Sequence, residues 1–356
     1  MRPMRARGLS LIAVLLVHVP MAFLFRGWRV LAQPLNGGLI QRVFNQPRFI
    51  KFQDTLAPSS LPRFYVIVMP LTLHFLLPCL ALLQGRAQVV LLSNGARRWE
   101  RQVLTKRFPH LPMFDLWTLP FSSVAHGHVI TLLLTNHRAN FGIIDHDCYV
   151  FDDAVFKQLS PASDECVVSL FSETSRSVGT TFPLTFFMYF NAEGLRRLMQ
   201  RYQVDARLYR KVPTTAVDAM ARIGLGPTIF WKDYHNFRDT LHVLLAVAVA
   251  EGLKFRFVAS GQDQPAMHVG GTSIGTHHTK ELQAHYIHLR FLELLNDPEV
   301  NRRYAFMCAP LEKSADALAR TDLTNPAWEW LPAFDTLMRR LRDALQDQAR
   351  TSNHRK

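Results

Sequence analysis

Apolar and polar residues follow one another along the chain in short blocks that predict strands and helices in turn. Short β-rich apolar runs predict strands, and longer runs with apolar positions on one helical face predict helices. The predicted strands are 64–68, 88–92, 140–144, 184–190 and 253–258. The predicted helices are 72–83, 97–108, 125–135, 192–202, 239–251, 279–295 and 331–349. This alternation indicates an α/β domain with a mostly parallel sheet flanked by helices.

The beginning of the chain departs from this pattern, because residues 9–25 are almost wholly apolar and arginines flank them on both sides. Three interpretations stay open: a helix lying on a membrane or docked on the domain, a single-span anchor, and a cleaved signal. A second apolar stretch, 64–83, contains Pro70, His74 and Pro78. We interpret it as a buried strand followed by a core helix.

The pattern predicts three parts. Residues 1–60 are an apolar, membrane-associating extension that continues into a loop-like stretch rich in Gln, Asn, Pro and Arg. Residues 61–300 form the main α/β domain, and residues 301–356 form a C-terminal helical segment with a basic tail.

Composition narrows the class of protein. Among 356 residues, 48% are hydrophobic and 19% charged, which is ample for a buried core and excludes a disordered chain. Four dispersed cysteines without a CxxC pair argue against a zinc ribbon or a disulfide framework. The formal charge of +13 favours polyanionic partners. Because the basic N-terminus is also apolar, we expect an anionic membrane surface and no nucleic acid.

The strongest local signal is the sequence FGIIDHDCYVF at 141–151, in which an apolar strand runs into Asp145 and Asp147. Ligands bind beyond the carboxyl ends of strands in open α/β sheets. Two neighbouring carboxylates repel each other unless a cation or ligand resolves the repulsion, and Mg²⁺ and Mn²⁺ prefer such oxygen ligands. The alternative is that Asp-x-Asp only shapes a turn.

In this context the chain resembles the GT-A (Rossmann-like) glycosyltransferases, in particular family-2-like bacterial members with a DxD motif. The resemblance covers about residues 86–290 and rests on the order of the motifs: a strand and loop at 89–95 (VVLLSNG), the segment 122–128 (SSVAHGH), and the DxD strand. It implies that Asp145 and Asp147 bind Mn²⁺ or Mg²⁺, and that Asn94, Gly95, His126 and Gly127 contact a nucleotide-sugar donor.

The resemblance also implies a general base at the start of the helix near 239. Asp239 fits that position best and Asp233 second, and an inverting reaction follows from such a base. An ordinary N-cap is the alternative for Asp239. The histidine beyond this helix, His268, matches a third metal ligand, and the Gly-rich loop after it brings Ser273 to the donor. Arg176 lies in a region that lines the acceptor side.

These expectations combine into a hexosyltransferase-like enzyme of glycan biosynthesis, acting on a glycan or lipid-linked acceptor at the cytoplasmic face of the inner membrane. Two alternatives remain: another metal-dependent phosphate-handling enzyme, such as a nucleotidyltransferase or phosphohydrolase, and a non-catalytic membrane-associated protein with a GT-A-like scaffold. Participation of Asp152 or Asp153 in the metal group would favour the phosphate-handling enzyme. Separation of Asp145 from Asp147 would favour the non-catalytic protein.

Overall fold

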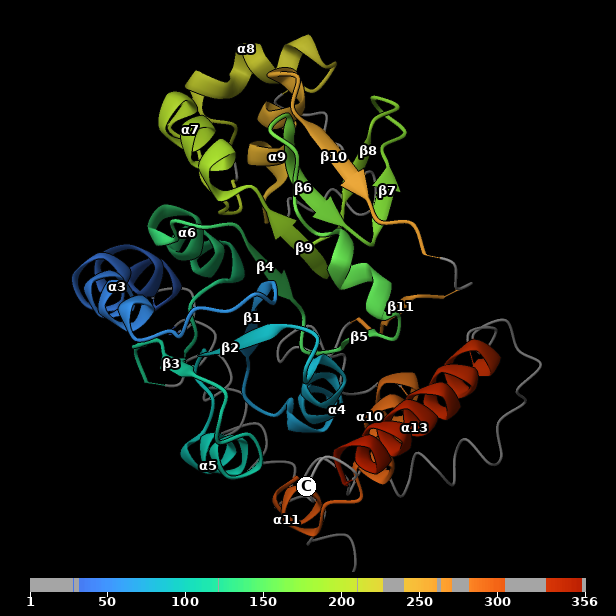
Figure 1. Cartoon of the computed structure of the whole chain (residues 1–356). Helices are drawn as coiled ribbons and strands as arrows, with labels where there is room; N and C mark the ends of the chain where they lie inside the picture. Colours follow the sequence, from blue (N-terminus) through green and yellow to red (C-terminus); the bar gives the residue numbers. More distant parts are fainter. Residues whose placement is uncertain are drawn as a thin grey trace, which may run out of the picture.

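The fold is an α/β domain in which helices cover both faces of one central sheet (Figure 1). The computed structural model describes residue 28 and residues 32–120, 122–209, 211–226, 240–260, 264–270, 282–304 and 331–353.

The central sheet has seven strands in the order β10-β6-β9-β4-β1-β2-β3. Their bounds are β1 Arg63–Val68, β2 Gln88–Ser93, β3 Met113–Asp115, β4 Phe141–Ile144, β6 Glu165–Ser169, β9 Phe187–Phe190 and β10 Lys254–Phe257. The pairs β1–β2, β1–β4, β2–β3 and β6–β10 are parallel, and β9 runs antiparallel to both β4 and β6. The carboxyl ends of β1, β2 and β4 therefore meet at one edge of the sheet.

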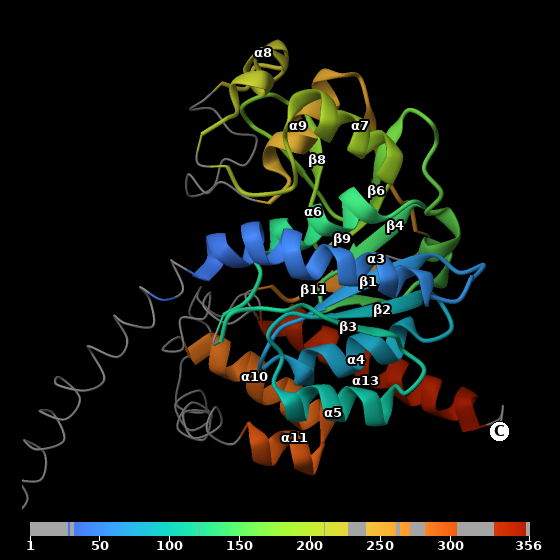
Figure 2. The same cartoon turned by 90° about the vertical axis from the view of Figure 1, so that its left-hand side faces the viewer.

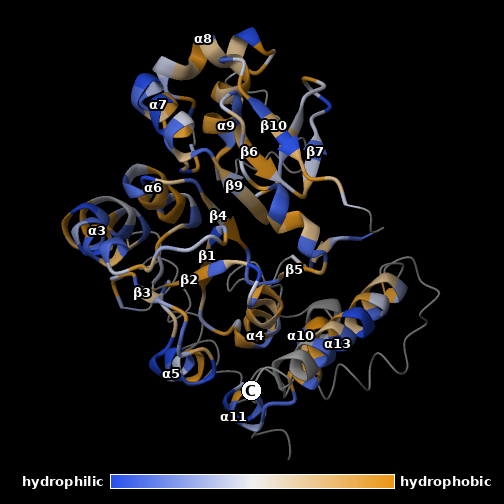
Figure 3. Ribbon diagram, in the orientation of Figure 1, coloured by the Kyte–Doolittle hydropathy of each residue, from blue (hydrophilic) through white to orange (hydrophobic). Residues whose placement is uncertain are grey.

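Alternation along β1 separates two cores. Tyr65 and Ile67 point into one core, whereas Phe64, Val66 and Val68 point into the other. The first core is closed by α3 Gln46–Asp54, α6 His126–Asn136, α7 Ala192–Tyr202, α8 Thr214–Arg222 and α9 His242–Ala250. The π-helix η2 Asn36–Asn45 directly precedes α3. The second core is closed by α4 Leu73–Leu83, α5 Arg98–Arg107, α10 Leu282–Leu295, α11 Pro298–Arg303 and α13 Leu331–Asn353. Figure 3 shows the apolar strands and α4 inside, and more polar residues on outer helices such as α5 and α7.

Two small sheets and a short helix complete the described part. β5 Cys148–Val150 pairs antiparallel with β11 Ala266–His268, and β7 Ser172–Thr174 pairs antiparallel with β8 Thr181–Pro183. The 3₁₀-helix η3 spans Asp153–Gln158. Among the helices that the structure describes, none has both the length and the hydropathy needed to cross a bilayer. Residues 9–25 lie outside the described residues.

The α/β prediction is confirmed, including the interpretation of 64–83 as a buried strand and a core helix. Two expected boundaries shift. The strand expected at 184–190 is confined to Phe187–Phe190, and the helix expected from 239 begins at His242, with Leu241 as its N-cap. The N-cap of that helix is therefore not Asp239.

The loop-like interpretation of the stretch before residue 60 is wrong for residues 36–54, which are helical. Three of the polar residues that suggested a loop, Asn36, Gln41 and Asn45, are buried against the protein. Phe49 of α3 is fully buried in the first core. This segment is therefore a structural part of the domain.

Candidate metal and donor site

The acidic motif forms a tight turn at the carboxyl end of β4. The N–H of Asp145 donates to the carbonyl oxygen of Phe186 at 2.9 Å, and the N–H of Cys148 donates to the carbonyl oxygen of Asp145 at 3.0 Å. Since β4 ends at Ile144 and β5 begins at Cys148, the turn contains only three residues. Both carboxylates are thereby held at the sheet edge where α/β proteins bind ligands.

His268 reaches this turn from far along the chain. It is the last residue of β11, and the antiparallel register of β11 with β5 places it opposite Cys148. Its Nε2 lies 3.3 Å from Oδ1 of Asp147 and 3.8 Å from Oδ2 of Asp145. The three residues offer one ligand atom each, all within 4.8 Å of one another. The sequence prediction of this trio as one group thus agrees with the geometry.

Neighbouring groups fix the trio in place. The N–H of Gly270 donates to Oδ2 of Asp147 at 3.1 Å, and the N–H of Val269 donates to its carbonyl oxygen at 3.2 Å. The ring of Phe186 stacks on the imidazole of His268 with centroids 3.5 Å apart. The ligand group is therefore held by backbone donors and by an aromatic face.

The trio is only partly open to solvent. The side chain of Asp147 is 3% exposed, that of His268 12% and that of Asp145 28%. Burial lowers the pKa of His268, but the hydrogen bond to Asp147 and the charges of both aspartates outweigh it and raise the pKa above 6.5. The two carboxylates thus create a strongly cation-attracting position.

The donor set fits a divalent cation such as Mn²⁺ or Mg²⁺. Two carboxylates and one imidazole suit Mn²⁺ well, and Mg²⁺ favours the carboxylates. Adjacent ligands around a cation bound at about 2.1 Å are roughly 3 Å apart, which is close to the observed separation of His268 and Asp147. Three protein ligands leave positions for phosphate oxygens and water.

The loop after β2 lies at the same edge, and its predicted donor residues have evident structural contacts. Asn94 is buried, its Nδ2 donates to the carbonyl oxygen of Val124 at 2.8 Å, and its Oδ1 accepts from the Val124 N–H at 2.7 Å. Gly95 has φ +81°, and a Cβ there would lie 2.9 Å from the carbonyl oxygen of Ser122. Both residues join their loop to segment 122–124. Donor contact by Asn94 and Gly95 stays a prediction.

The other described candidates lie on separate elements. His126 is half-buried and begins α6, and a Cβ on Gly127 would come within 2.5 Å of the carbonyl oxygen of Ala206. Gly127 therefore permits close packing of α6 on the loop containing Ala206. Arg176 is exposed in the connection between β7 and β8. Donor contact by His126 and Gly127 and the acceptor-side role of Arg176 stay predictions.

Three further candidates, Asp233, Asp239 and Ser273, lie outside the described residues.

Phe186 and Gly270 are the contributors that the sequence interpretation missed. Phe186 belongs to an aromatic run that was expected to be core, and Gly270 donates through its backbone. The sequence interpretation also missed a contact beneath the turn, where the Cys79 thiol of α4 donates to the carbonyl oxygen of Cys148 at 3.2 Å. Burial, with the nearby aspartate charges, raises the pKa of Cys79, so the thiol stays neutral. No sequence pattern could have identified these contacts.

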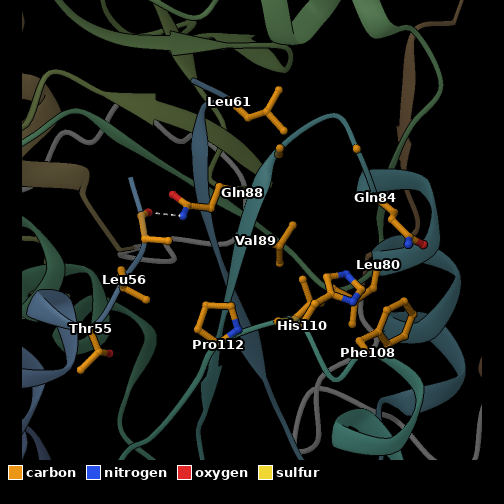
Figure 4. Close-up of a pocket in the computed structure, with 14 residues that line it drawn as sticks. Thr55, Leu56, Leu61, Leu80, Gln84, Gln88, Val89, Phe108, His110 and Pro112 are labelled. Atoms are coloured by element: carbon orange, nitrogen blue, oxygen red, sulfur yellow. Dashed lines mark hydrogen bonds between the residues drawn. The ribbon is translucent and has the colours of Figure 1, made fainter. Parts of the chain in front are cut away.

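A hollow of about 420 Å³ lies at the opposite edge of the sheet (Figure 4). Its lining includes Leu56, Leu80, Val89, Phe108 and His110. The described lining contains no carboxylate and surrounds the start of β2, so it does not belong to the metal group.

Comparison with known proteins then identifies the domain. Residues 41–195 match the family model of the StrH glycosyltransferase N-terminal domain. Residues 41–195 are a glycosyltransferase domain. The matched residues contain both metal-group aspartates, whereas His268 lies beyond them. The prediction of a glycosyltransferase is confirmed over these residues.

Solved structures similar to this chain include three glycosyltransferases. GlyE from Streptococcus pneumoniae TIGR4 has a TM-score of 0.34 and 9% identity, and the match covers 56% of this chain and 45% of GlyE. For an active-site mutant of LgtC the TM-score is 0.41 and the identity 10%, with 67% of this chain and 99% of LgtC covered. For the bifunctional glycosyltransferase WbbM the TM-score is 0.30 and the identity 12%, with 58% of this chain and 47% of WbbM covered. The chain spans less than half of GlyE and of WbbM. A search of curated proteins finds no match.

Proposed function

We propose that this glycosyltransferase moves a sugar from a nucleotide-sugar donor to a glycan or lipid-linked acceptor with the help of Mn²⁺ or Mg²⁺ bound by Asp145, Asp147 and His268. The observation that carries the proposal is the convergence of these three side chains within 4.8 Å at the carboxyl edge of the sheet. A cation bound there would neutralise the donor's diphosphate as the nucleotide leaves.

The protein's own residues perform three tasks in this proposal. The turn at Asp145–Cys148 and strand β11 hold the ligands in a fixed arrangement, which lowers the cost of binding. Asp147 is oriented by the backbone N–H of Gly270. Asp239, with Asp233 as the second choice, accepts the proton of the acceptor hydroxyl, so the product has an inverted anomeric configuration.

The surroundings of Asp152 and Asp153 weigh against a different metal-dependent phosphate enzyme. Asp152 accepts from the N–H of Ala154 at 2.9 Å and from the hydroxyl of Ser260, and Asp153 pairs with Arg86 at 2.8 Å. Both acids are thus engaged away from the trio. The shared position of Asp145 and Asp147 also weighs against a non-catalytic scaffold.

Thermal unfolding with a panel of sugar nucleotides, with and without Mn²⁺, tests the proposal. A ligand that binds only the folded state at about 100 times its Kd adds about 2.7 kcal/mol to the free energy of unfolding. We expect one donor to raise the midpoint by several degrees, and only with the cation present. The Asp147→Asn variant should lose this shift, whereas the matched Asp152→Asn variant should keep it.

Equal shifts with and without cation would refute the metal assignment, and no shift with any sugar nucleotide would refute the donor class. NMR of the product's anomeric proton then tests inversion, because retention would exclude a direct displacement promoted by Asp239.

The proposed place of action is the cytoplasmic face of the inner membrane, where lipid-linked acceptors are found. The support is the basic charge of +13 together with the apolar, arginine-flanked sequence at 9–25.

A further inference from the structure

The helix η2 has its polar residues inside. Asn36, Gln41 and Asn45 are buried against the domain, at spacings of five and four residues. Residues at these spacings share one side of a π-helix, whose hydrogen bonds join residues five apart. A helix on the surface of a soluble protein normally buries its apolar stripe instead. The arrangement therefore reverses the usual polarity.

Hydrogen bonds stabilise the buried polar side. The Asn36 amide donates to the Ser122 hydroxyl at 2.8 Å, and its oxygen accepts from the Leu119 N–H at 2.9 Å. Asn45 donates to the Trp117 carbonyl oxygen at 3.0 Å and accepts from the Trp117 N–H at 2.7 Å.

Gln41 adds a further bond, because its amide donates to the His128 carbonyl oxygen at 2.6 Å. These bonds join the helix to residues 72 to 87 positions away in sequence. The orientation of η2 is therefore fixed by specific contacts.

Four apolar residues of the segment face outward, whereas Ile40 and Phe49 are buried. Leu39 is 63% exposed, Val43 53%, Leu35 47% and Phe44 44%. The exposed ring of Trp117 lies against Phe44, with centroids 4.6 Å apart. We call these five side chains the outward apolar face. In Figure 2 the η2–α3 segment runs across the front of the molecule, with α6 beside it.

A lipid surface fits this face better than a protein partner does, because basic residues surround the face and an apolar stretch precedes it in the chain. Arg42, Arg48 and Lys51 are exposed within the same segment. The first acidic residue of the whole chain is Asp54, so every charged side chain before it is basic. The apolar, arginine-flanked residues 9–25 precede the face directly in sequence. Apolar side chains with basic and tryptophan neighbours are typical of the interface of anionic membranes.

The face also begins beside the catalytic edge. Asn36 contacts Ser122 and Ser123, and the next residue, Val124, is held by Asn94 at the end of β2. The far end of the segment reaches the opposite edge, where the Ala57 carbonyl oxygen accepts from Gln88. A membrane on the outward apolar face would therefore lie along the flank of the domain and adjoin the edge that carries the metal group.

We propose that the outward apolar face docks this domain on an anionic lipid bilayer, so that lipid-linked acceptors meet the metal-bearing edge at the membrane surface. The inference rests on the proposed membrane location and not on transferase turnover. It assigns the contact to Leu35, Leu39, Val43, Phe44 and Trp117 in addition to any contribution of residues 9–25.

Fluorophore attachment tests this contact in the full chain. In a Cys308→Ser background, Leu39→Cys carries an environment-sensitive label on the face, and Gln102→Cys carries it on the exposed side of α5, on the other side of the sheet. The other cysteines, Cys79, Cys148 and Cys166, are buried. With vesicles of phosphatidylcholine and phosphatidylglycerol, the label at 39 should shift to the blue and be quenched by a lipid-borne quencher. The label at 102 should not change.

Three outcomes would overturn the proposal. The label at 39 could remain water-like while the protein sediments with vesicles, which would assign binding to another part of the chain. The protein could fail to bind vesicles at all. A blue shift that grows with protein concentration without lipid would show instead that a second copy covers the face. None of these readouts needs a sugar donor, so failure of the docking proposal can be distinguished from failure of the proposed transferase function.

Vesicle partitioning of substituted proteins gives a second measure. Leu39→Gln with Val43→Gln should lower the partition coefficient at least about tenfold, since apolar burial drives interfacial binding. The matched pair Leu39→Met with Val43→Ile should leave it unchanged. Omitting phosphatidylglycerol should lower it about a hundredfold, because three nearby cations contribute roughly fivefold each. Equal losses in both double variants would contradict the docking role.

Discussion

Helix α4 and the η2–α3 segment cover opposite faces of one sheet and use their apolar side chains in opposite ways. In α4 every residue except Ala81 is buried, and the helix supports the metal turn through Cys79. In η2 the buried residues are Asn36, Ile40, Gln41 and Asn45, while Leu39, Val43 and Phe44 are exposed. The difference shows that the contact partners of a helix decide which of its sides is buried.

The two segments also relate differently to function. α4 is enclosed, so its apolar residues stabilise the domain and hold the acidic motif from beneath. The η2 helix is attached mainly by polar side chains, so its exposed apolar residues contribute little to folding and remain available for a partner. Substitutions in the two places should therefore separate activity, stability and membrane binding.

The largest effect is expected at the motif that α4 supports. Asp147→Ala removes one carboxylate of the trio and should lower kcat/KM on the order of 10³-fold, about 4 kcal/mol of transition-state stabilisation. Unfolding in denaturant should remain near that of the unmodified protein. Asp152→Asn is the matched control, because Asp152 bonds to Ala154 and Ser260 instead. Full transferase activity of Asp147→Ala would show that the trio binds no catalytic metal.

A core truncation in α4 should come next. Leu76 is fully buried, and Leu76→Ala should lower the free energy of unfolding by about 3 kcal/mol through lost burial and a residual cavity. Leu39→Ala on η2 removes the same atoms from a side chain that is 63% exposed, and should cost less than about 0.5 kcal/mol. Urea unfolding measures both. Similar losses would mean that the η2 face is packed in the folded protein.

These contrasts explain how far the sequence could predict the molecule. Five strands of the sheet, α4, α7 and α13 follow from local patterning, because their apolar residues are the buried ones. The strands β3 and β6 of the same sheet were not predicted. The Asp145, Asp147 and His268 group was predicted from motif order and is brought together by the β5–β11 pairing. The role of η2 was not predicted, because its polar residues bond to partners 72 to 87 positions away. Phe186 and Gly270 could not be predicted either, since stacking and backbone donation leave no sequence motif.

Removing one of those distant polar partners should have an intermediate effect. Asn45→Ala leaves the N–H and the carbonyl oxygen of Trp117 without their side-chain partner, which should cost about 1–3 kcal/mol in the free energy of unfolding. Gln33→Ala, at an exposed position shortly before η2, is the matched control and should be neutral. Chemical denaturation compares them. A neutral Asn45→Ala would show that the inward polar side does not hold the helix in place.

The smallest effect on stability is expected where the apolar face meets solvent. Leu39→Gln with Val43→Gln replaces two exposed apolar side chains by polar ones, so the free energy of unfolding should change by less than about 0.5 kcal/mol. The same change at fully buried Leu76 would place an amide among apolar groups and should prevent stable folding. Thermal unfolding of the two proteins therefore shows which of the two segments tolerates polar side chains. If the η2 double variant unfolded as readily as Leu76→Gln, the outward side would be part of the core, and a lipid surface would have nothing to contact there.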